Sequence, residues 1–423
     1  MSAFMIILMV LLFALSIPIA IAILGSALGG VVFFTKLNPL VIAQRLVTTL
    51  DSFPLLAIPF FILAGNLMEA SGISQRLVEF AKALVGRLQG GLAASCVITC
   101  MIFASVSGSS IATTFAIGAI IIPAMVKHGY PVRFSAALQA TSAELGVIIP
   151  PSIPMIIYGV SAEVSIGELF IAGIGPGILI SLALIGFVLI MCRRNGWGHQ
   201  DGDGSMRLLP AIVQAAWGLG MPVIILGGIY QGVFTPTEAA AVAVVYSFMV
   251  GVFVYRTLNA RSLYIALRKS VISSAVIMFI IAAAGTFSFL LTRAGVPAAI
   301  GNWLVEIFHG QVAFLLAVNV VLFFVGMFIE TSAAIIVLAP ILAPVAAQFG
   351  VDPIHFGLIM IVNLAMGMIT PPFGVNLFAA CEVARIPIDQ IISRLVPFVL
   401  VIACCLMIIT FVPEISLLFR QLR

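Results

Sequence analysis

The chain reads Gly146-Val-Ile-Ile-Pro-Pro-Ser152 in its first half and Gly367-Met-Ile-Thr-Pro-Pro-Phe-Gly374 in its second half. Each stretch lies in an apolar part of the chain and places a Pro-Pro pair a few residues after a glycine. Proline lacks an amide donor and clashes with the preceding helical turn, so a helix breaks at such a pair and leaves carbonyl oxygens free. We therefore expect two apolar helices that are broken at matching places.

The two breaks belong to an internal repeat. One constant shift along the chain aligns residues of the first half with identical residues of the second half: Ala112 with Ala333, Ile120 with Ile341, Pro123 with Pro344, Gly129 with Gly350, Gly146 with Gly367, and Pro150 with Pro371. Most of these positions are Gly or Pro, which decide backbone conformation more than side-chain packing. The repeat therefore predicts two halves of similar backbone structure.

The composition places this repeat in a membrane. Of 423 residues, 63% are hydrophobic and 8% are charged, with a mean hydropathy of +1.28, whereas soluble domains have about 25% charged residues. Runs of about 20 apolar residues predict membrane-spanning helices, and the clear ones are 53–70, 167–191, 211–233, 236–254, 271–291 and 396–413. Segment 2–35 forms either one long tilted span or two short helices that meet near Ser16 and Pro18. The net charge of +4 is small and forms no basic patch with aromatic residues, so we expect no nucleic-acid partner.

Positive charges set the orientation, because Lys and Arg are enriched in cytoplasmic loops. The loops that carry them, and that we expect on the cytoplasmic side, are 76–87, 127–133, 193–207, 256–269 and 385–394. The loops that carry neither, and that we expect outside, are 161–168, 234–238 and 348–354.

Segment 93–126 has no charged residue although both of its flanks are basic, so both of its ends are expected on the cytoplasmic side. Its halves, 93–107 and 111–125, are each about 22 Å long as helices, which is too short for a hydrocarbon core of about 30 Å. We predict a re-entrant hairpin with its tip at 105–110. Segment 313–347 carries one charge, Glu330, and its flanks lack the basic bias, so we predict a second hairpin that enters from the other side, with its tip at 326–332.

Two hairpins that enter from opposite sides make the repeat an inverted one. Paired broken helices in inverted repeats are typical of secondary transporters. The predicted fold is an all-α polytopic membrane protein with two re-entrant helical hairpins and two broken helices. Its parts are first-repeat scaffold helices (1–92), the first hairpin and broken helix of a transport domain (93–165), connecting and second-repeat scaffold helices (166–312), the second hairpin and broken helix (313–384), and a C-terminal helix (385–423).

Carbonyl and hydroxyl oxygens at the tips and breaks suit a hard cation such as Na⁺. Each half offers one such set, so we expect two pseudo-equivalent sodium sites. The candidate ligands are Ser107, Gly108, Ser109, Ser110, Gly146 and Pro150 in the first half, and Gly326, Thr331, Ser332, Gly367 and Thr370 in the second. The alternative interpretation is that Ser and Gly only allow the helices to pack closely.

Helix N-termini at both tips and after both breaks point partial positive charge at the membrane centre, which favours an anionic substrate. The candidate substrate-binding residues are Ser109, Ser152, Glu330, Thr331, Asn363 and Asn376. The two asparagines have an alternative role as buried polar contacts between helices, and Glu330 has an alternative role as a helix cap. The role of Glu144 is open, and Thr235-Pro-Thr-Glu238 has the pattern of a capping box.

The sequence resembles the large membrane subunit of TRAP transporters, the tripartite ATP-independent periplasmic transporters. The stretches that carry the resemblance are SFPLLAIPFFILAGNLM (52–68), GSSIATTFAIGAIIIPAM (108–125), GVIIPPSIPMIIYG (146–159), GGIYQGVFTPTEAAAVAVVY (227–246) and HFGLIMIVNLAMGMITPPFGVNLF (355–378). The similarity runs from near the N-terminus to the C-terminus, and the motifs are specific as an ordered set.

The resemblance implies two partners: a small four-helix membrane subunit, expected as a separate polypeptide, and a soluble periplasmic substrate-binding protein. It also implies a place in the bacterial inner membrane and sodium-coupled uptake of an organic acid by an elevator-type, ion-transporter-like fold. Its ion-binding regions would be 107–110, 146–151, 326–332 and 367–371. A C4-dicarboxylate is the favoured substrate, with sialic acid or another carboxylate as alternatives. Glu144 departs from the small or uncharged residue that the resemblance leads us to expect.

Other interpretations assign the same sequence to a different class of protein. A stand-alone sodium–carboxylate symporter or antiporter would have the same architecture. An intramembrane enzyme is disfavoured, because no HExxH, GxGD or nucleophile–base pattern occurs in the predicted spans. A passive channel is disfavoured, because paired broken helices with polar tips favour an occluded site. We expect no cofactor, with Na⁺ serving as the coupling ion.

Overall fold

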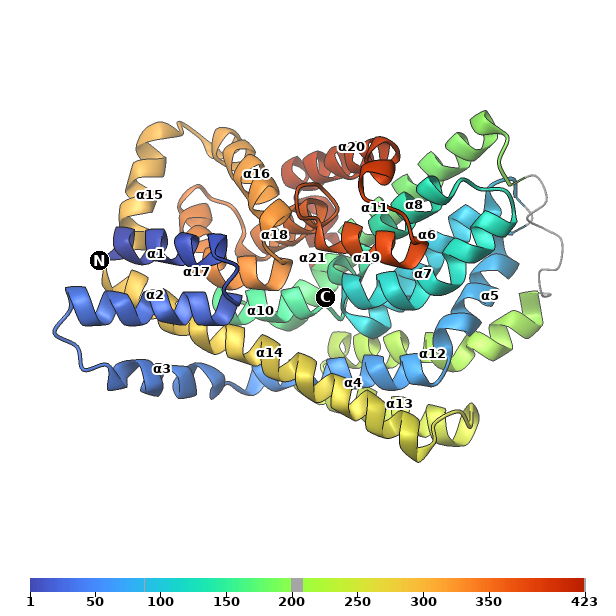
Figure 1. The fold of residues 1–423 in the computed structure, drawn as a ribbon, viewed down its shortest axis with the longest axis horizontal. Helices are drawn as coiled ribbons and strands as arrows, with labels where there is room; N and C mark the ends of the chain where they lie inside the picture. Colours follow the sequence, from blue (N-terminus) through green and yellow to red (C-terminus); the bar gives the residue numbers. More distant parts are fainter. Residues whose placement is uncertain (87, 199–207, 422–423) are drawn as a thin grey trace.

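The computed structural model describes residues 1–86, 88–198 and 208–421, and every regular element among them is a helix (Figure 1). Two basic loop residues, Arg87 and Arg207, lie outside the described residues. In the described part of the chain, nine helices are long and apolar enough to cross a membrane, or up to ten if one bent pair counts as a single span. All six spans predicted from the sequence are among them, which confirms the all-α polytopic fold.

The first half of the chain contains helices whose order the second half partly repeats. They are α1 (Ser2–Ala14), α2 (Ile19–Phe34), α3 (Leu40–Leu50), the short turn η1 (Phe53–Leu56), α4 (Ala57–Ala70), α5 (Ile73–Val85), α6 (Gly91–Ser107), α7 (Ser110–Lys127), α8 (Val132–Ala143), α9 (Leu145–Ile148), α10 (Ile153–Ser161) and α11 (Ile166–Asn195).

The helices of the second half are α12 (Leu208–Tyr230), α13 (Pro236–Met249), the π-helical turn η2 (Val250–Val254), α14 (Ala260–Arg293), α15 (Val296–Ile307), α16 (Gln311–Phe328), α17 (Thr331–Gln348), α18 (Pro353–Met368), α19 (Val375–Ala384), α20 (Asp389–Phe411) and α21 (Glu414–Gln421). From α5 onward, the first-half helices recur in the same order as α15 to α20. The two helices that follow the hairpin tips, α7 and α17, both have 18 residues. The backbone repeat inferred from Gly and Pro positions is therefore present in the fold.

The first residues of the chain form two short helices rather than one long span, which is the second of the two predicted alternatives. The chain turns between α1 and α2 at Ser16, which has a φ of 60°, and Pro18 precedes the first turn of α2. The helices then pack against each other, with the ring of Phe4 at 4.9 Å from that of Phe34 and 6.0 Å from that of Phe33. This N-terminal hairpin lies at the left of Figure 1, where α2 packs against α14.

Both predicted hairpins are pairs of helices joined by a two-residue turn. Gly108-Ser109 joins α6 to α7, and Ile329-Glu330 joins α16 to α17. The arms have 17 or 18 residues and are slightly longer than the sequence predicted. The first hairpin opens toward the right of Figure 1 and the second toward the left, so the repeat is inverted.

Each predicted break is a non-helical stretch that follows a buried helix end. Residues 149–152 separate α9 from α10, and residues 369–374 separate α18 from α19. The first broken helix bends by 43° between its two parts. Both Pro-Pro peptide bonds, Pro150-Pro151 and Pro371-Pro372, are cis.

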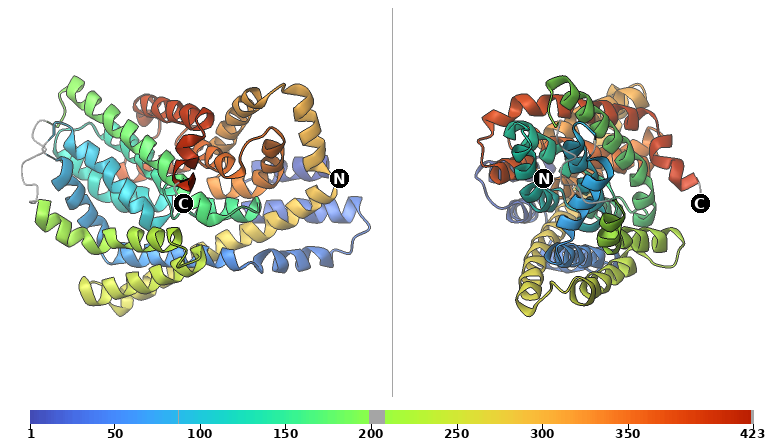
Figure 2. Two further views of the ribbon diagram at one scale, coloured as in Figure 1. Left: turned by 180° about the vertical axis from the view of Figure 1, so that it is seen from behind. Right: turned by 90° about the vertical axis from the view of Figure 1, so that its right-hand side faces the viewer.

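The two halves interlock through the helices that follow the breaks. The helix α10 packs on α17 of the other hairpin, and α19 packs on α7. To one side of this centre, the 34-residue helix α14 runs along α3 and α4 (Figure 2). The hairpins and breaks therefore form one body that long helices flank, while the division into transport and scaffold domains stays a prediction.

Two of the basic loops that we expect on the cytoplasmic side, 127–133 and 256–269, lie at one end of the molecule. The α5–α6 and α7–α8 connections and the start of α14 lie at the right of Figure 1, whereas the α2–α3 connection and α15 lie at the left. A common side for these two loops is what the positive charges predict, although the α2–α3 connection at the other end also carries a lysine, Lys36; the orientation in the membrane stays a prediction.

Candidate substrate and cation site

The backbone of the first tip packs closely against that of the first break. Gly108 adopts a φ of 62°, and its carbonyl accepts a hydrogen bond from the amide of Ile153 at 3.4 Å. Gly146 faces the tip from the other side, where an added Cβ would lie 2.7 Å from the carbonyl oxygen of Ser109. A glycine is needed here because backbone approaches backbone.

Oxygen atoms concentrate at this first tip. The hydroxyls of Ser107 and Thr113 lie 3.1 Å apart, and the Thr113 hydroxyl donates to the carbonyl of Ser109 at 2.8 Å. Ser109 also accepts from the amide of Ala112 at 3.4 Å and so caps α7. Behind the tip, Ser152 donates to the carbonyl of Val147 at 2.6 Å. The sequence candidates of the first half thus lie together.

The second tip is built in the same way with different side chains. Glu330 takes the place that Ser109 has in the first repeat and caps α17, accepting from the amide of Ala333 at 3.1 Å. Its other oxygen accepts from the hydroxyl of Ser332 at 2.9 Å. The cap role considered for Glu330 is therefore present, and it places a carboxylate at the tip.

The second break is likewise packed closely against the tip of its own repeat. An added Cβ on Gly326 would lie 2.7 Å from the carbonyl oxygen of Leu364, and one on Gly367 would lie 2.8 Å from the amide nitrogen of Met327. Two further candidates have their hydroxyls in local contacts: Thr331 with the sulfur of Met368 at 2.9 Å, and Thr370 with the carbonyl of Met366 at 2.9 Å. Gly326, Gly367 and Thr331 are thus brought together, whereas the hydroxyl of Thr370 bonds only within its own segment of the chain.

One cavity of about 380 Å³ joins the two tips. Ser109 and Ser110 line it from the first tip, and Glu330 and Ser332 line it from the second. The first turns of α7 and α10 open onto it, as does Ala333 in the first turn of α17. Helix N-termini carry partial positive charge, so this cavity combines an anion-favouring electrostatic field with oxygen-rich tips. Two predicted substrate-binding residues, Ser152 and Thr331, are buried and do not line this cavity, although each is next to a lining residue in the chain.

A second cavity of about 440 Å³ adjoins the first at Ser109. It lies between the first tip, α4 and α14, and it is lined by Ser107, Asn66, Glu69 and Lys269 among others. Asn66, Glu69 and Lys269 are not among the site residues predicted from the sequence. The available signal was Glu69, an acid inside the predicted span 53–70.

The two asparagine candidates line neither cavity. Asn376 donates to Glu144 at 2.6 Å, and its carbonyl oxygen lies 2.8 Å from the hydroxyl of Thr114. These three fully or almost fully buried residues tie the second-half helix α19 to α7 and to the end of α8. The second oxygen of Glu144 has no hydrogen-bond partner. Glu144 and Asn376 therefore form a buried hydrogen-bonded pair that links the two repeats.

Asn363 belongs to a separate buried contact. It donates to the side-chain and backbone oxygens of Asn319 at 2.8 and 3.0 Å, and Asn319 donates to the hydroxyl of Thr410 at 3.1 Å. This network joins α18 to α16 and α20, as expected for the helix-packing role considered for Asn363. The predicted capping box is also present: Glu238 and Thr235 bond each other's backbone amides at the start of α13.

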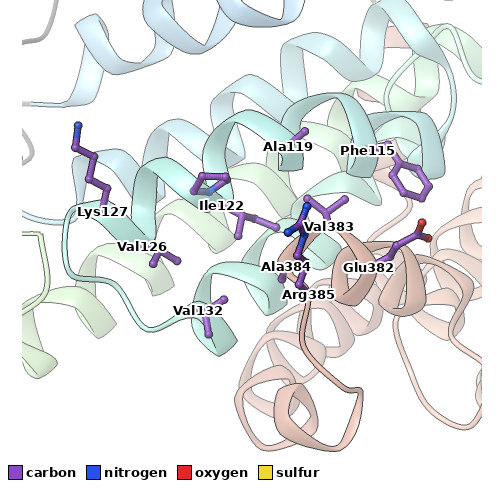
Figure 3. A pocket seen from close by; sticks show the side chains of 11 residues that line it. Phe115, Ala119, Ile122, Val126, Lys127, Val132, Glu382, Val383, Ala384 and Arg385 are labelled. Carbon is purple, nitrogen blue, oxygen red and sulfur yellow. The ribbon is translucent and has the colours of Figure 1, made fainter.

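A larger hollow of about 770 Å³ lies between α7, α8 and α19 (Figure 3). Phe115 and Glu382 stand at one end of it and Lys127 at the other. Apolar side chains such as Ile122 line most of it, and no residue of either tip does. We therefore place the candidate site at the tips and not in this hollow.

Two interlocked inverted repeats, each with a hairpin and a broken helix, and two tips that share one cavity define a secondary transporter of the inverted-repeat class. The chain belongs to the family described as "Tripartite ATP-independent periplasmic transporter, DctM component", whose model matches residues 6–415. The resemblance seen in the sequence is thereby confirmed, and the protein is a multi-pass membrane subunit of a transporter rather than an enzyme.

Named relatives agree with this assignment. The chain is 44% identical over 376 residues to the C4-dicarboxylate TRAP transporter large permease protein DctM of Pseudomonas aeruginosa, covering 89% of this chain and 88% of that one. It is 43% identical over 410 residues to the isethionate TRAP transporter permease protein DctMQ of Oleidesulfovibrio alaskensis, covering 97% of this chain but 65% of the length of that protein. The crystal structure of the Alcanivorax borkumensis YdaH transporter shares the fold, with a TM-score of 0.63, 17% identity, and coverage of 88% of this chain and 87% of that one.

Proposed function

We propose that the protein is the large permease subunit of a tripartite, sodium-coupled secondary transporter in the bacterial inner membrane. It imports a small organic acid that a periplasmic binding protein delivers, and it works together with a small four-helix membrane subunit. The observation that carries this proposal is the single cavity shared by the two tips, where helix N-termini meet hydroxyl groups and one carboxylate. A C4-dicarboxylate is the favoured acid, supported by the names of relatives such as the Pseudomonas aeruginosa permease.

Na⁺ enters this proposal as a cotransported substrate. The first site would use oxygens of 107–110 with those of the first break, and the second would use oxygens of 326–332 with those of the second break. The close packing of each break on its own tip supports the pairing, because a hard cation needs several oxygens at fixed distances. Bound Na⁺ would offset the charge of the acid, and the body that holds both hairpins would then move against α4 and α14.

The first test is uptake into liposomes that contain this subunit with its small partner. The binding protein is supplied outside with ¹⁴C-labelled succinate, and uptake is compared with and without an inward Na⁺ gradient. We expect uptake to require both. Uptake of free succinate without the binding protein would instead favour a stand-alone carrier, and uptake that ignores the Na⁺ gradient would exclude the cation sites. Ser109→Ala and Thr331→Ala are each expected to raise the half-saturating Na⁺ concentration about tenfold, since a lost oxygen contact of about 1.4 kcal/mol corresponds to that factor.

A second test separates the two roles of Glu330. Glu330→Ser gives the second tip the capping residue that the first tip has, so α17 stays capped while the carboxylate is removed. We expect the same thermal stability in detergent and an increase of at least about tenfold in the half-saturating Na⁺ concentration, because a neighbouring opposite charge attracts a cation strongly at low dielectric. An unchanged Na⁺ dependence would assign Glu330 to capping alone.

A further inference from the structure

An ion pair beside the first tip has no role in the function proposed above. Lys269 of α14 lies 2.9 Å from Glu69 of α4, and both line the cavity of about 440 Å³. Across this cavity are Ser107 and Ser109 of the first tip. The tip is held close to α4 at Gly65, where an added Cβ would lie 3.2 Å from the Cα of Ser107.

Lys269 is the one basic residue among the described residues that line either tip cavity. The two cavities share five lining residues: Ser109, Ile111, Ile153, Ser273 and Ile277. An anion that moves from the shared cavity past Ser109 therefore enters the space that Lys269 faces. The other hydrogen-bond donors among the side chains that line this second cavity are neutral, so Lys269 is the partner there that carries a positive charge for a carboxylate.

The position of Lys269 along α14 gives the path a direction. Ser273 and Ile277 line both cavities, and Lys269 lies one and two turns before them, about 6 and 12 Å along the helix. Arg261 and Arg268 lie on the same side of Ser273, in the segment whose positive charge predicts a cytoplasmic position. Lys269 is thus placed between the tips and the expected cytoplasmic end.

The Glu69–Lys269 ion pair can open at little cost, so that Lys269 can exchange its contact with Glu69 for one with another anion. The side chains are 33% and 53% exposed, and such ion pairs contribute little net stability. A neighbouring hydrogen bond of 2.8 Å between Asn66 and Ser270 joins the same two helices, so α4 and α14 stay together when the ion pair opens. The lysine side chain is flexible and presents its charge as a point that can follow an anion.

We propose that Lys269 receives the carboxylate of the transported acid as it leaves the tips toward the cytoplasm, exchanging its contact with Glu69 for one with the substrate. This inference rests on the proposed function, since it takes an organic anion as the cargo. Glu69 then competes with the substrate for Lys269, and the return of Glu69 releases the acid. The two residues of the pair therefore have opposite effects on the anion, which a merely structural ion pair would not have.

The test uses the full chain with its small partner in inside-out membrane vesicles, with the six native cysteines replaced by alanine and Ser273→Cys introduced between the cavities. A membrane-impermeant thiol reagent labels this position, and succinate is the probe that slows labelling. We measure the succinate concentration that halves the labelling rate. Lys269→Gln is expected to raise it about tenfold and Glu69→Gln to lower it several-fold. The double variant is expected to resemble Lys269→Gln, and neutral succinamide is expected to give no protection.

The matched control is Lys82→Gln, which removes a lysine from another helix ion pair, with Glu79 at 3.0 Å, that lines neither cavity. It is expected to leave protection unchanged. The proposal is overturned if Lys269→Gln and Glu69→Gln shift protection in the same direction, if both match the control, or if succinate fails to protect when Lys269 is present. The uptake assay described above decides separately whether the chain transports the acid, so a failure of the exit role and a failure of the proposed function are distinguishable.

Discussion

Gly367→Ala is expected to reduce Na⁺-driven uptake by more than about a hundredfold and to lower the thermal unfolding temperature. Gly367 lies in the last turn of α18, before the second break, and its added Cβ would meet the backbone of Gly326 and lie 2.8 Å from the amide nitrogen of Met327. These are backbone atoms, so no side chain can rotate away. Overpacking of a tight interior costs about 1–3 kcal/mol or more, and a cost of about 3 kcal/mol reduces the population with a closed tip about a hundredfold.

The control for this prediction is Gly186→Ala in the middle of α11, where no atom lies within 4 Å of the added Cβ. Alanine favours helix by about 1 kcal/mol over glycine, so this variant is expected to be as active as the parent and as stable or more so. Unfolding of the detergent-solubilised protein and uptake into liposomes are measured for both variants. Normal uptake by Gly367→Ala would show that the second break does not need to touch its tip.

The breaks and tips could be predicted from the sequence because they are set by local backbone chemistry. The Pro-Pro pairs at 150–151 and 371–372 each remove two successive amide donors from a helix, whereas single prolines such as Pro123 are tolerated inside helices here. Glycines such as Gly108 mark turns that other residues rarely adopt. The spans could be predicted because apolar length decides them. The predicted hairpin arms were slightly too short: α6 begins at Gly91 rather than at 93, and α7 runs from Ser110 to Lys127 rather than from 111 to 125.

The remaining features depend on contacts between segments that are far apart in the chain. Glu69 and Lys269 meet because α14 runs along α4, and a sequence pattern within either helix does not reveal it. The shared cavity forms because the two tips face each other, and the internal repeat in the sequence does not tell how close together the two tips lie. The same limit applies to Glu144, whose position before the first break was evident but whose partner, Asn376, comes from the other repeat.

Asn376→Asp is expected to destabilise the folded protein severely at neutral pH and to abolish uptake. The side-chain amide of Asn376 is the donor in a 2.6 Å hydrogen bond to Glu144, and both residues are buried. The substitution replaces that donor with a second carboxylate oxygen. Breaking a buried polar pair so that charge is left uncompensated costs about 3–5 kcal/mol, and here the second oxygen of Glu144 has no hydrogen-bond partner to share the cost.

Adding Glu144→Gln to Asn376→Asp is expected to restore most of the stability and uptake, because the amide then donates from position 144 to the carboxylate at position 376. The other carboxylate oxygen still accepts from the hydroxyl of Thr114, which lies 2.8 Å from the present acceptor. Glu144→Gln alone keeps an acceptor for Asn376 and is expected to unfold at the parent temperature or above. If the double variant is as unstable as Asn376→Asp, the contact between the repeats depends on the charge of Glu144 itself, and a simple exchange of donor and acceptor does not describe it.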